Sequence, residues 1–177
     1  MMLSRSVRHK ITKHLPKLYA FASTLTLSLA IVNALPRVRQ HKQQQRQLRF
    51  AEASVDGDLR RMRALHAAGA SVNARITCCL PLFLAASEGK LEAVRYLLDE
   101  GADINAREKL GDTALSEATY YGRLDVVKEL LFRGADVNAV GKEGTALDIA
   151  IKKNYSDIAD LLKHHGAERM CELRKCQ

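Results

Sequence analysis

The chain repeats one phrase at a nearly constant spacing. It reads Gly-Ala-Ser-Val-Asn-Ala at 69–74, Gly-Ala-Asp-Ile-Asn-Ala at 101–106 and Gly-Ala-Asp-Val-Asn-Ala at 134–139, with a partial copy at Gly166 and Ala167. Successive glycines of the phrase are 32, 33 and 32 residues apart. Periods of this size are the signature of stacked repeat proteins, in which each unit buries its apolar face against its neighbours.

Apolar residues between the phrases recur with helical spacing. In the third unit, one apolar stretch runs from Thr113 to Gly122, and a second carries leucine or valine at positions 124, 127, 130 and 131. This spacing predicts an amphipathic helix. Gly122 and Gly134 stand where a helix should end in a left-handed turn, and Asn154 replaces the turn glycine in the fourth unit. Each unit is therefore predicted to be helix, turn, helix, glycine stop and loop.

This pattern resembles the ankyrin repeat, whose signature is a Thr-Pro-Leu-His turn, an inner helix, an outer helix and a Gly-Ala-Asp-Val-Asn-Ala exit. The resemblance covers about residues 47–168 and implies an all-α solenoid of four repeats, at about 47–77, 78–110, 111–143 and 144–168. Phe83, Ser116 and Asp148 stand where the family has histidine. The loops that join one repeat to the next are called fingers, and two of the three are one residue short. His66 and Lys163 replace leucines of the inner units, so we expect the outer units to cap the stack.

The formal net charge of +8 is unevenly distributed along the 177 residues. Residues 1–49 contain ten of the 28 Lys and Arg residues and no acid, which leaves 18 basic against 20 acidic residues, a net charge of −2, in residues 50–177. A slightly acidic domain is poorly suited to holding phosphates. We therefore expect no nucleic-acid binding by the repeats.

Residues 1–36 are predicted to be a basic and hydrophobic targeting or membrane-anchor segment, followed by a basic, Gln-rich linker at 37–46. Residues 18–35 carry no charge, and as a hydrophobic helix they would span roughly 27 Å. Four interpretations stay open: a single membrane span, a signal peptide cleaved near Val32-Asn33-Ala34, a mitochondrial transit peptide, or a helix packed on the first repeat. The expected location is accordingly a membrane, with secretion, the periplasm or mitochondria as alternatives. Five basic residues flank the segment on each side, so its orientation is undecided.

No set of residues in the sequence indicates catalysis, a cofactor or a metal site. The six histidines and four cysteines lack the spacing of metal ligands, and no glycine-rich phosphate loop is present. Cys171 and Cys176, in a tail at 169–177, would be able to form a disulfide in an oxidising compartment, with ordinary thiols as the alternative. The chain is predicted to be a monomer and not an enzyme.

The family resemblance implies that partners contact the finger tips and the exposed inner-helix residues just before the turn glycine. In this chain those positions are Arg75, Ile76, Ser87, Glu88, Lys109, Leu110, Asp112, Tyr120, Tyr121, Lys142, Lys152 and Lys153. The alternative for each is a merely solvated side chain. Tyr120 and Tyr121 are two adjacent aromatic residues in a chain with few others, and we predict that they form the centre of the site.

These observations favour a non-enzymatic protein–protein interaction module, a scaffold or adaptor that is anchored in a membrane or exported. The alternative is a regulatory or protective partner of a co-located enzyme, with the concave face covering a site on that enzyme. The charge distribution argues against a nucleic-acid-binding protein. The lack of a recognisable set of catalytic residues in the sequence argues against an enzyme.

Overall fold

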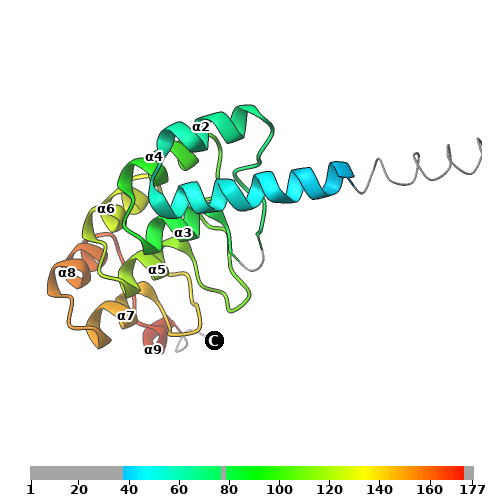
Figure 1. The fold of residues 1–177 in the computed structure, drawn as a ribbon. Coiled ribbons are helices and arrows are strands. Elements are labelled where there is room, and N and C mark those ends of the chain that lie inside the picture. Colours follow the sequence, from blue (N-terminus) through cyan, green and yellow to red (C-terminus); the bar gives the residue numbers. More distant parts are fainter. Residues whose placement is uncertain (1–37, 77–78, 174–177) are drawn as a thin grey trace, which may run out of the picture. The chain divides into compact units, whose positions relative to one another are not determined.

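The computed structural model describes residues 38–76 and 79–173 and divides into two compact units, Met1–Gln44 and Gln45–Gln177. The second unit is built from paired helices (Figure 1). The inner helices are α3 (Pro81–Ser87), α5 (Ala114–Tyr120) and α7 (Ala146–Lys152). The outer helices are α2 (Leu59–Ala67), α4 (Leu91–Asp99), α6 (Leu124–Phe132) and α8 (Ser156–His164), and the short α9 (Met170–Leu173) follows them.

Each helix packs on its partner within a repeat and on the helices of the same row in the adjacent repeats. Thus α5 contacts α3, α6 and α7, while α6 also contacts α4 and α8. Within the described residues all regular structure is helical, and only isolated β-bridges occur in the loops. The predicted all-α solenoid is confirmed for this unit.

Two of the inner helices, α5 and α7, begin at residues whose side chains cap them, whereas α3 begins after Leu80 without a side-chain cap. Thr113 and Thr145 are the N-caps of α5 and α7, and the third helical residues, Ser116 and Asp148, return hydrogen bonds to the cap backbone. These reciprocal bonds satisfy amide groups that the first helical turn leaves unpaired. At the family's histidine position, Ser116 and Asp148 therefore serve as capping partners, whereas Phe83 does not.

The tight turns inside the repeats require a left-handed backbone. Gly122 has φ of 67°, and Asn154, the equivalent residue of the fourth repeat, has φ of 59°. Asparagine tolerates this region better than other residues with a side chain. The prediction that Asn154 preserves the turn is confirmed.

One hydrophobic core runs through the stack. Its largest fully buried side chains include Leu97, Leu115, Leu130 and Leu162, one or more from each of the last three repeats. Phe50 and Met62 extend the core into the first repeat. Because leucines occupy the same place in successive units, the core continues without a boundary between repeats.

The first helix is longer than the sequence pattern predicts. Residues 38–56 are helical, so the segment predicted as a linker at 37–46 is helical over 38–46. Gln, Arg, Lys and Leu, which dominate this stretch, are good helix formers. Residues 50–56 supply the inner helix of the first repeat, and Gly57 follows as its turn.

Asparagines of the repeated phrase join one repeat to the next. Asn73 donates to the carbonyl oxygen of Gly101 and accepts from the amide of Asp103, both at 2.9 Å. Asn105 accepts from the amide of Asp136 at 2.8 Å. Asn138 donates to Gly166 and accepts from Glu168 in the same way as Asn73. These exit-loop clamps give the recurring asparagine a structural role.

The predicted targeting segment at 1–36, its hydrophobic helix and Cys176 all lie outside the described residues. Among the helices that the structure describes, none combines the length and apolar character needed to cross a membrane.

Candidate partner-binding groove

The fingers between repeats differ in length and closure. The short first and third fingers close through antiparallel bridges, Ile76 with Cys79 and Gly141 with Gly144. In the longer second finger, the amide of Glu108 donates to the carbonyl oxygen of Asp112 at 2.8 Å. The extra residue follows from the 33-residue period and sets the second finger apart from its neighbours.

The first finger is held against the second by Arg75. Its guanidinium donates to the carboxylate of Glu108 at 2.9 Å and to the carbonyl oxygen of Arg107 at 2.8 Å. The neighbouring Ile76 is buried, with 9% of its surface exposed. The expectation that Ile76 is exposed at a finger tip is therefore wrong, because its side chain packs inward as the finger closes.

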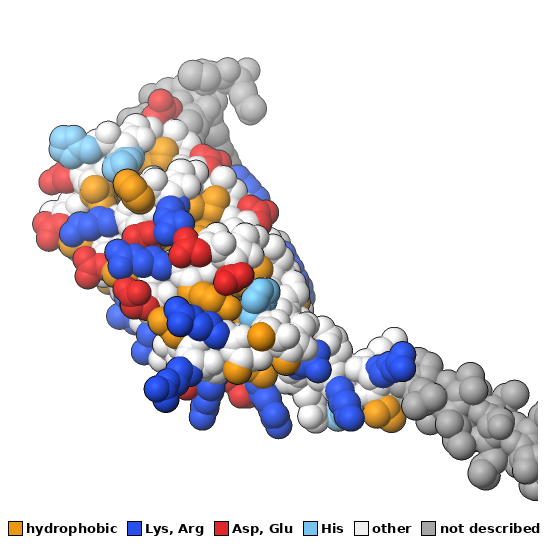
Figure 2. Space-filling model, turned by 90° about the horizontal axis from the view of Figure 1, so that it is seen from above, with side chains coloured by type: hydrophobic (Ala, Val, Ile, Leu, Met, Phe, Trp, Pro, Cys, Tyr) orange, Lys and Arg blue, Asp and Glu red, His pale blue; other side chains and the backbone are white. Residues whose placement is uncertain are grey.

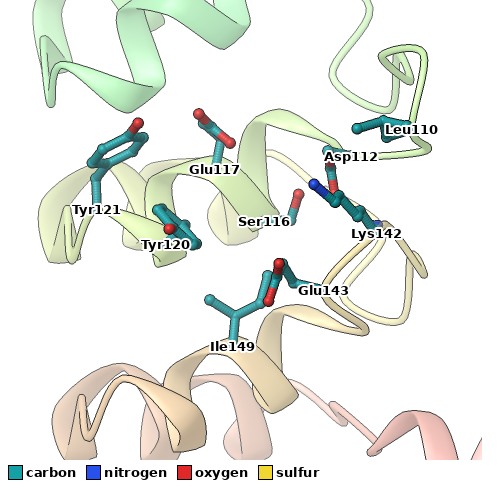
Figure 3. Close-up of a pocket in the computed structure, with 9 residues that line it drawn as sticks. All are labelled: Leu110, Asp112, Ser116, Glu117, Tyr120, Tyr121, Lys142, Glu143 and Ile149. Carbon is teal, nitrogen blue, oxygen red and sulfur yellow. The ribbon is translucent and has the colours of Figure 1, made fainter.

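An open groove of about 280 Å³ lies between the second finger, the third finger and the inner helices α5 and α7 (Figure 3). It is lined by Leu110, Asp112, Ser116, Glu117, Tyr120, Tyr121, Lys142, Glu143 and Ile149. Five of these nine, Leu110, Asp112, Tyr120, Tyr121 and Lys142, are among the positions expected from the sequence. The groove thus brings together residues from two repeats and both fingers.

Tyr120 is the last residue of α5 and Tyr121 is its C-cap, and both are exposed, at 36% and 49%. Their ring centroids are 5.2 Å apart and the rings meet edge to face at 76°. This is a favourable geometry for an aromatic pair. The pair offers a rigid apolar surface with two hydroxyl groups at the side of the groove.

Two lysines at the C-terminal end of α7, its last residue Lys152 and its C-cap Lys153, border the tyrosines. The ammonium of Lys153 lies 3.7 Å from the centroid of the Tyr120 ring, within the range of a cation–π interaction. Lys152 forms an ion pair with Glu143. The hydrogen bond of this pair raises the pKa of Lys152 and lowers the pKa of Glu143.

Glu117 is a groove residue that the sequence analysis did not select. It lies one helical turn before Tyr121 and projects from the same side of α5 (Figure 3). Burial raises the pKa of the Glu117 carboxyl, and the nearby carboxylates of Asp112 and Glu108 raise it further. Glu117 precedes Tyr121 by four residues, and residues with this spacing lie on the same side of a helix. That spacing was the sequence signal that would have identified Glu117.

The other expected positions do not line this groove. Ser87 is half-buried and its hydroxyl donates to the carbonyl oxygen of Leu84, whereas Glu88 and Lys109 are exposed. Ser116, Glu143 and Ile149 line it but were also missed. They were missed because the family's contact positions were applied one repeat at a time, whereas the groove is formed across two repeats.

Elsewhere the surface carries both signs of charge. Figure 2 shows acidic and basic side chains interspersed on the face that it presents. On the outer helices, Glu129 pairs with Arg95 and Arg133 at 2.9 and 3.0 Å, and Arg133 also pairs with Asp99. These pairs link α4 to α6. In the described part of the chain no cluster of His, Cys, Asp and Glu could hold a metal ion.

Stacked helix pairs, glycine-ended outer helices and paired fingers define a solenoid of the ankyrin type. Residues 50–141 and 82–171 match the family described as ankyrin repeats (3 copies), so the chain belongs to the ankyrin repeat family. A stretch of 49 residues is 47% identical to the human protein "Ankyrin repeat and KH domain-containing protein 1". That match covers 28% of this chain and only 2% of the length of the human protein.

Ankyrin repeats are protein–protein interaction modules, and the proteins built from them are generally scaffolds and not enzymes. The family resemblance and the exposed groove therefore indicate the same general function.

Proposed function

We propose that the chain is a protein-binding module whose partner contacts the groove centred on Tyr120 and Tyr121. The observation that carries the proposal is the exposed edge-to-face tyrosine pair at the side of an open groove. Tyrosine is enriched at binding hot spots, because it supplies a large contact area and loses little side-chain entropy on docking. Leu110, from the second finger, adds exposed apolar area.

The test is the double variant Tyr120→Ala, Tyr121→Ala in the full chain, assayed against a partner identified by chemical crosslinking. Affinity should fall by at least about 2 kcal/mol, or roughly thirtyfold, if both residues are hot spots. Phe132→Ala is the matched control, because Phe132 is an aromatic residue of α6 that is 83% exposed and outside the groove. An unchanged affinity in a folded double variant would contradict the proposed site.

A second part of the proposal concerns the location of the module. Residues 18–35 form an uncharged stretch between basic flanks, which supports anchoring in a membrane or export across one. Leu27→Arg should abolish either route, because a charge at the centre of an inserting segment costs about 2.5–3.5 kcal/mol. Cell fractionation with N-terminal sequencing measures this, and an uncleaved wild-type chain confined to the cytosolic fraction would contradict it.

Binding of nucleic acid is not part of the proposed function, because residues 50–177 carry a net charge of −2. The proposal also takes the chain to be a monomer. Sedimentation of the purified chain tests the second point, and titration with labelled DNA at low salt tests the first.

A further inference from the structure

Glu117 is a half-buried carboxylate that faces other carboxylates. Asp112 and Glu108 are the charges that act on it, and both disfavour its ionised form. Within the described residues, no hydrogen bond or ion pair reaches its carboxylate. An acid in this position costs stability in the free protein, because burial and like charges both oppose ionisation.

The other acids of this region have partners within the protein itself. Glu108 accepts from the guanidinium of Arg75 and from the amide of Leu80 at 2.8 Å. Glu143 is paired with Lys152. Glu117 therefore differs from its neighbours in having its negative charge open to the groove.

The groove already contains one example of a cation on a tyrosine ring. Lys153 places its ammonium over Tyr120, whereas among the described residues no cation is stacked on the more exposed Tyr121. In Figure 3 the Tyr121 ring and the Glu117 carboxylate project together from α5. The two side chains leave space for a second cation with a carboxylate on one side and an aromatic ring on the other.

We propose that this space binds an arginine or lysine side chain of an extended protein segment, with its cation between Glu117 and the open face of Tyr121. The inference rests on the proposed protein-binding function and specifies the chemistry of the partner. A cation there would gain a charge pair in a partly desolvated site together with a cation–π contact. Leu110, at the far side of the groove, would contact an apolar residue of the same segment.

Other occupants are disfavoured by charge. Three acids, Asp112, Glu117 and Glu143, line the groove against one cation, Lys142, so an acidic peptide would bring further negative charge into an acidic groove. Outside this lining, Lys152 is already paired with Glu143 and Lys153 is stacked on Tyr120. The phosphates of a nucleic acid would meet the same repulsion. The choice between a basic and an acidic segment is therefore a direct test of the inference.

The experiment selects peptides from a phage-displayed library of random linear sequences on the immobilised full chain. Peptides retained by the wild type should be enriched in Arg and Lys and should include an apolar residue nearby. A retained peptide, resynthesised, should bind Glu117→Gln at least about tenfold more weakly, because its cation loses a charged partner. Glu52→Gln, which removes an exposed acid in the first repeat, is the matched control and should bind like the wild type.

The outcomes separate this inference from the proposed function. Peptides that lack basic residues but still depend on Tyr120 and Tyr121 would overturn the inference and leave the groove as the binding site. Enrichment of Asp and Glu, or full retention of an Arg-containing peptide by folded Glu117→Gln, would also overturn it. Peptides that bind the double tyrosine variant as well as the wild type would contradict the proposed site itself.

Discussion

Asp148 stabilises two parts of the fourth repeat at once, and its replacement by alanine gives a sharp test of the fold. Its carboxylate accepts from the amide of Thr145 at 3.1 Å, from the hydroxyl of Thr145 at 3.0 Å and from the amide of Met170 at 2.9 Å. Arg169 adds an ion pair at 3.2 Å. One side chain thus completes the cap of α7 and fixes the start of α9.

The magnitude follows from what the substitution leaves unpaired. Thr145 is buried, so water cannot easily replace the lost acceptor of its amide, and an unsatisfied buried donor costs about 1–3 kcal/mol. The amide of Met170 and the guanidinium of Arg169 are closer to solvent and contribute less. Asp148→Ala should therefore lower the free energy of unfolding by about 2–3 kcal/mol, which corresponds to a decrease in Tm of about 8 °C.

The dependence on pH identifies the carboxylate as the cause. Burial raises the pKa of Asp148, but the hydrogen bonds from Met170, Thr145 and Arg169 outweigh it, so its pKa lies below the ordinary value. Because the folded pKa is below the unfolded value of about 3.9, the contribution of the carboxylate is complete above that pH and is lost as the pH falls through the folded pKa. The stability gap between the wild type and Asp148→Asn should be present at neutral pH and should narrow below about pH 4.

Urea unfolding followed by circular dichroism across this pH range measures both effects. Asp125→Asn is the control, because Asp125 occupies the first turn of α6 and is exposed. If Asp148→Ala were within about 0.5 kcal/mol of the wild type at neutral pH, the reasoning from the buried cap would be wrong.

Further substitutions test other features of the stack. Asn154→Ala should lower the free energy of unfolding by about 1 kcal/mol because of its positive φ, whereas Asn154→Gly should leave it within about 0.5 kcal/mol, both by urea unfolding. Glu129→Gln removes the shared partner of Arg95 and Arg133 and should cost about 1 kcal/mol at low salt and less at high salt; equal costs at both would contradict an ionic origin. Leu130→Ala should cost about 2–5 kcal/mol by opening a cavity in the fully buried core, and a smaller loss would show that the neighbouring repeats collapse into it.

The sequence was sufficient for those features that depend on residues within one repeat. Helical spacing predicted both rows of helices, and the glycine pattern predicted the turns, including the one at Asn154. The acids at 92, 125 and 157 recur at one position of the repeat and lie in the first turn of the outer helices, where a negative charge is favoured by the helix dipole.

Features formed between repeats could not be predicted in the same way. The burial of Ile76 depends on how the first finger closes, and the pairing of Arg75 with Glu108 crosses two fingers. The negative charges around Glu117 come from Glu108 and Asp112 on the second finger, so they depend on how this finger folds beside α5. The periodicity of one unit does not indicate which side chains of two adjacent repeats lie close together. The groove is therefore visible only in the three-dimensional structure.

The exit-loop clamps limit how the array could be lengthened. In the partial phrase that starts at Gly166, Met170 stands where the three earlier copies have asparagine. A methionine side chain cannot donate to one backbone group and accept from the next, as Asn73 and Asn138 do. A further repeat added after this position, by tandem duplication or by design, would stack its helices on the fourth repeat but would lack the asparagine hydrogen bonds that join the earlier repeats. Restoring asparagine at position 170 would be a precondition for growth of the array, and it would also displace the start of α9.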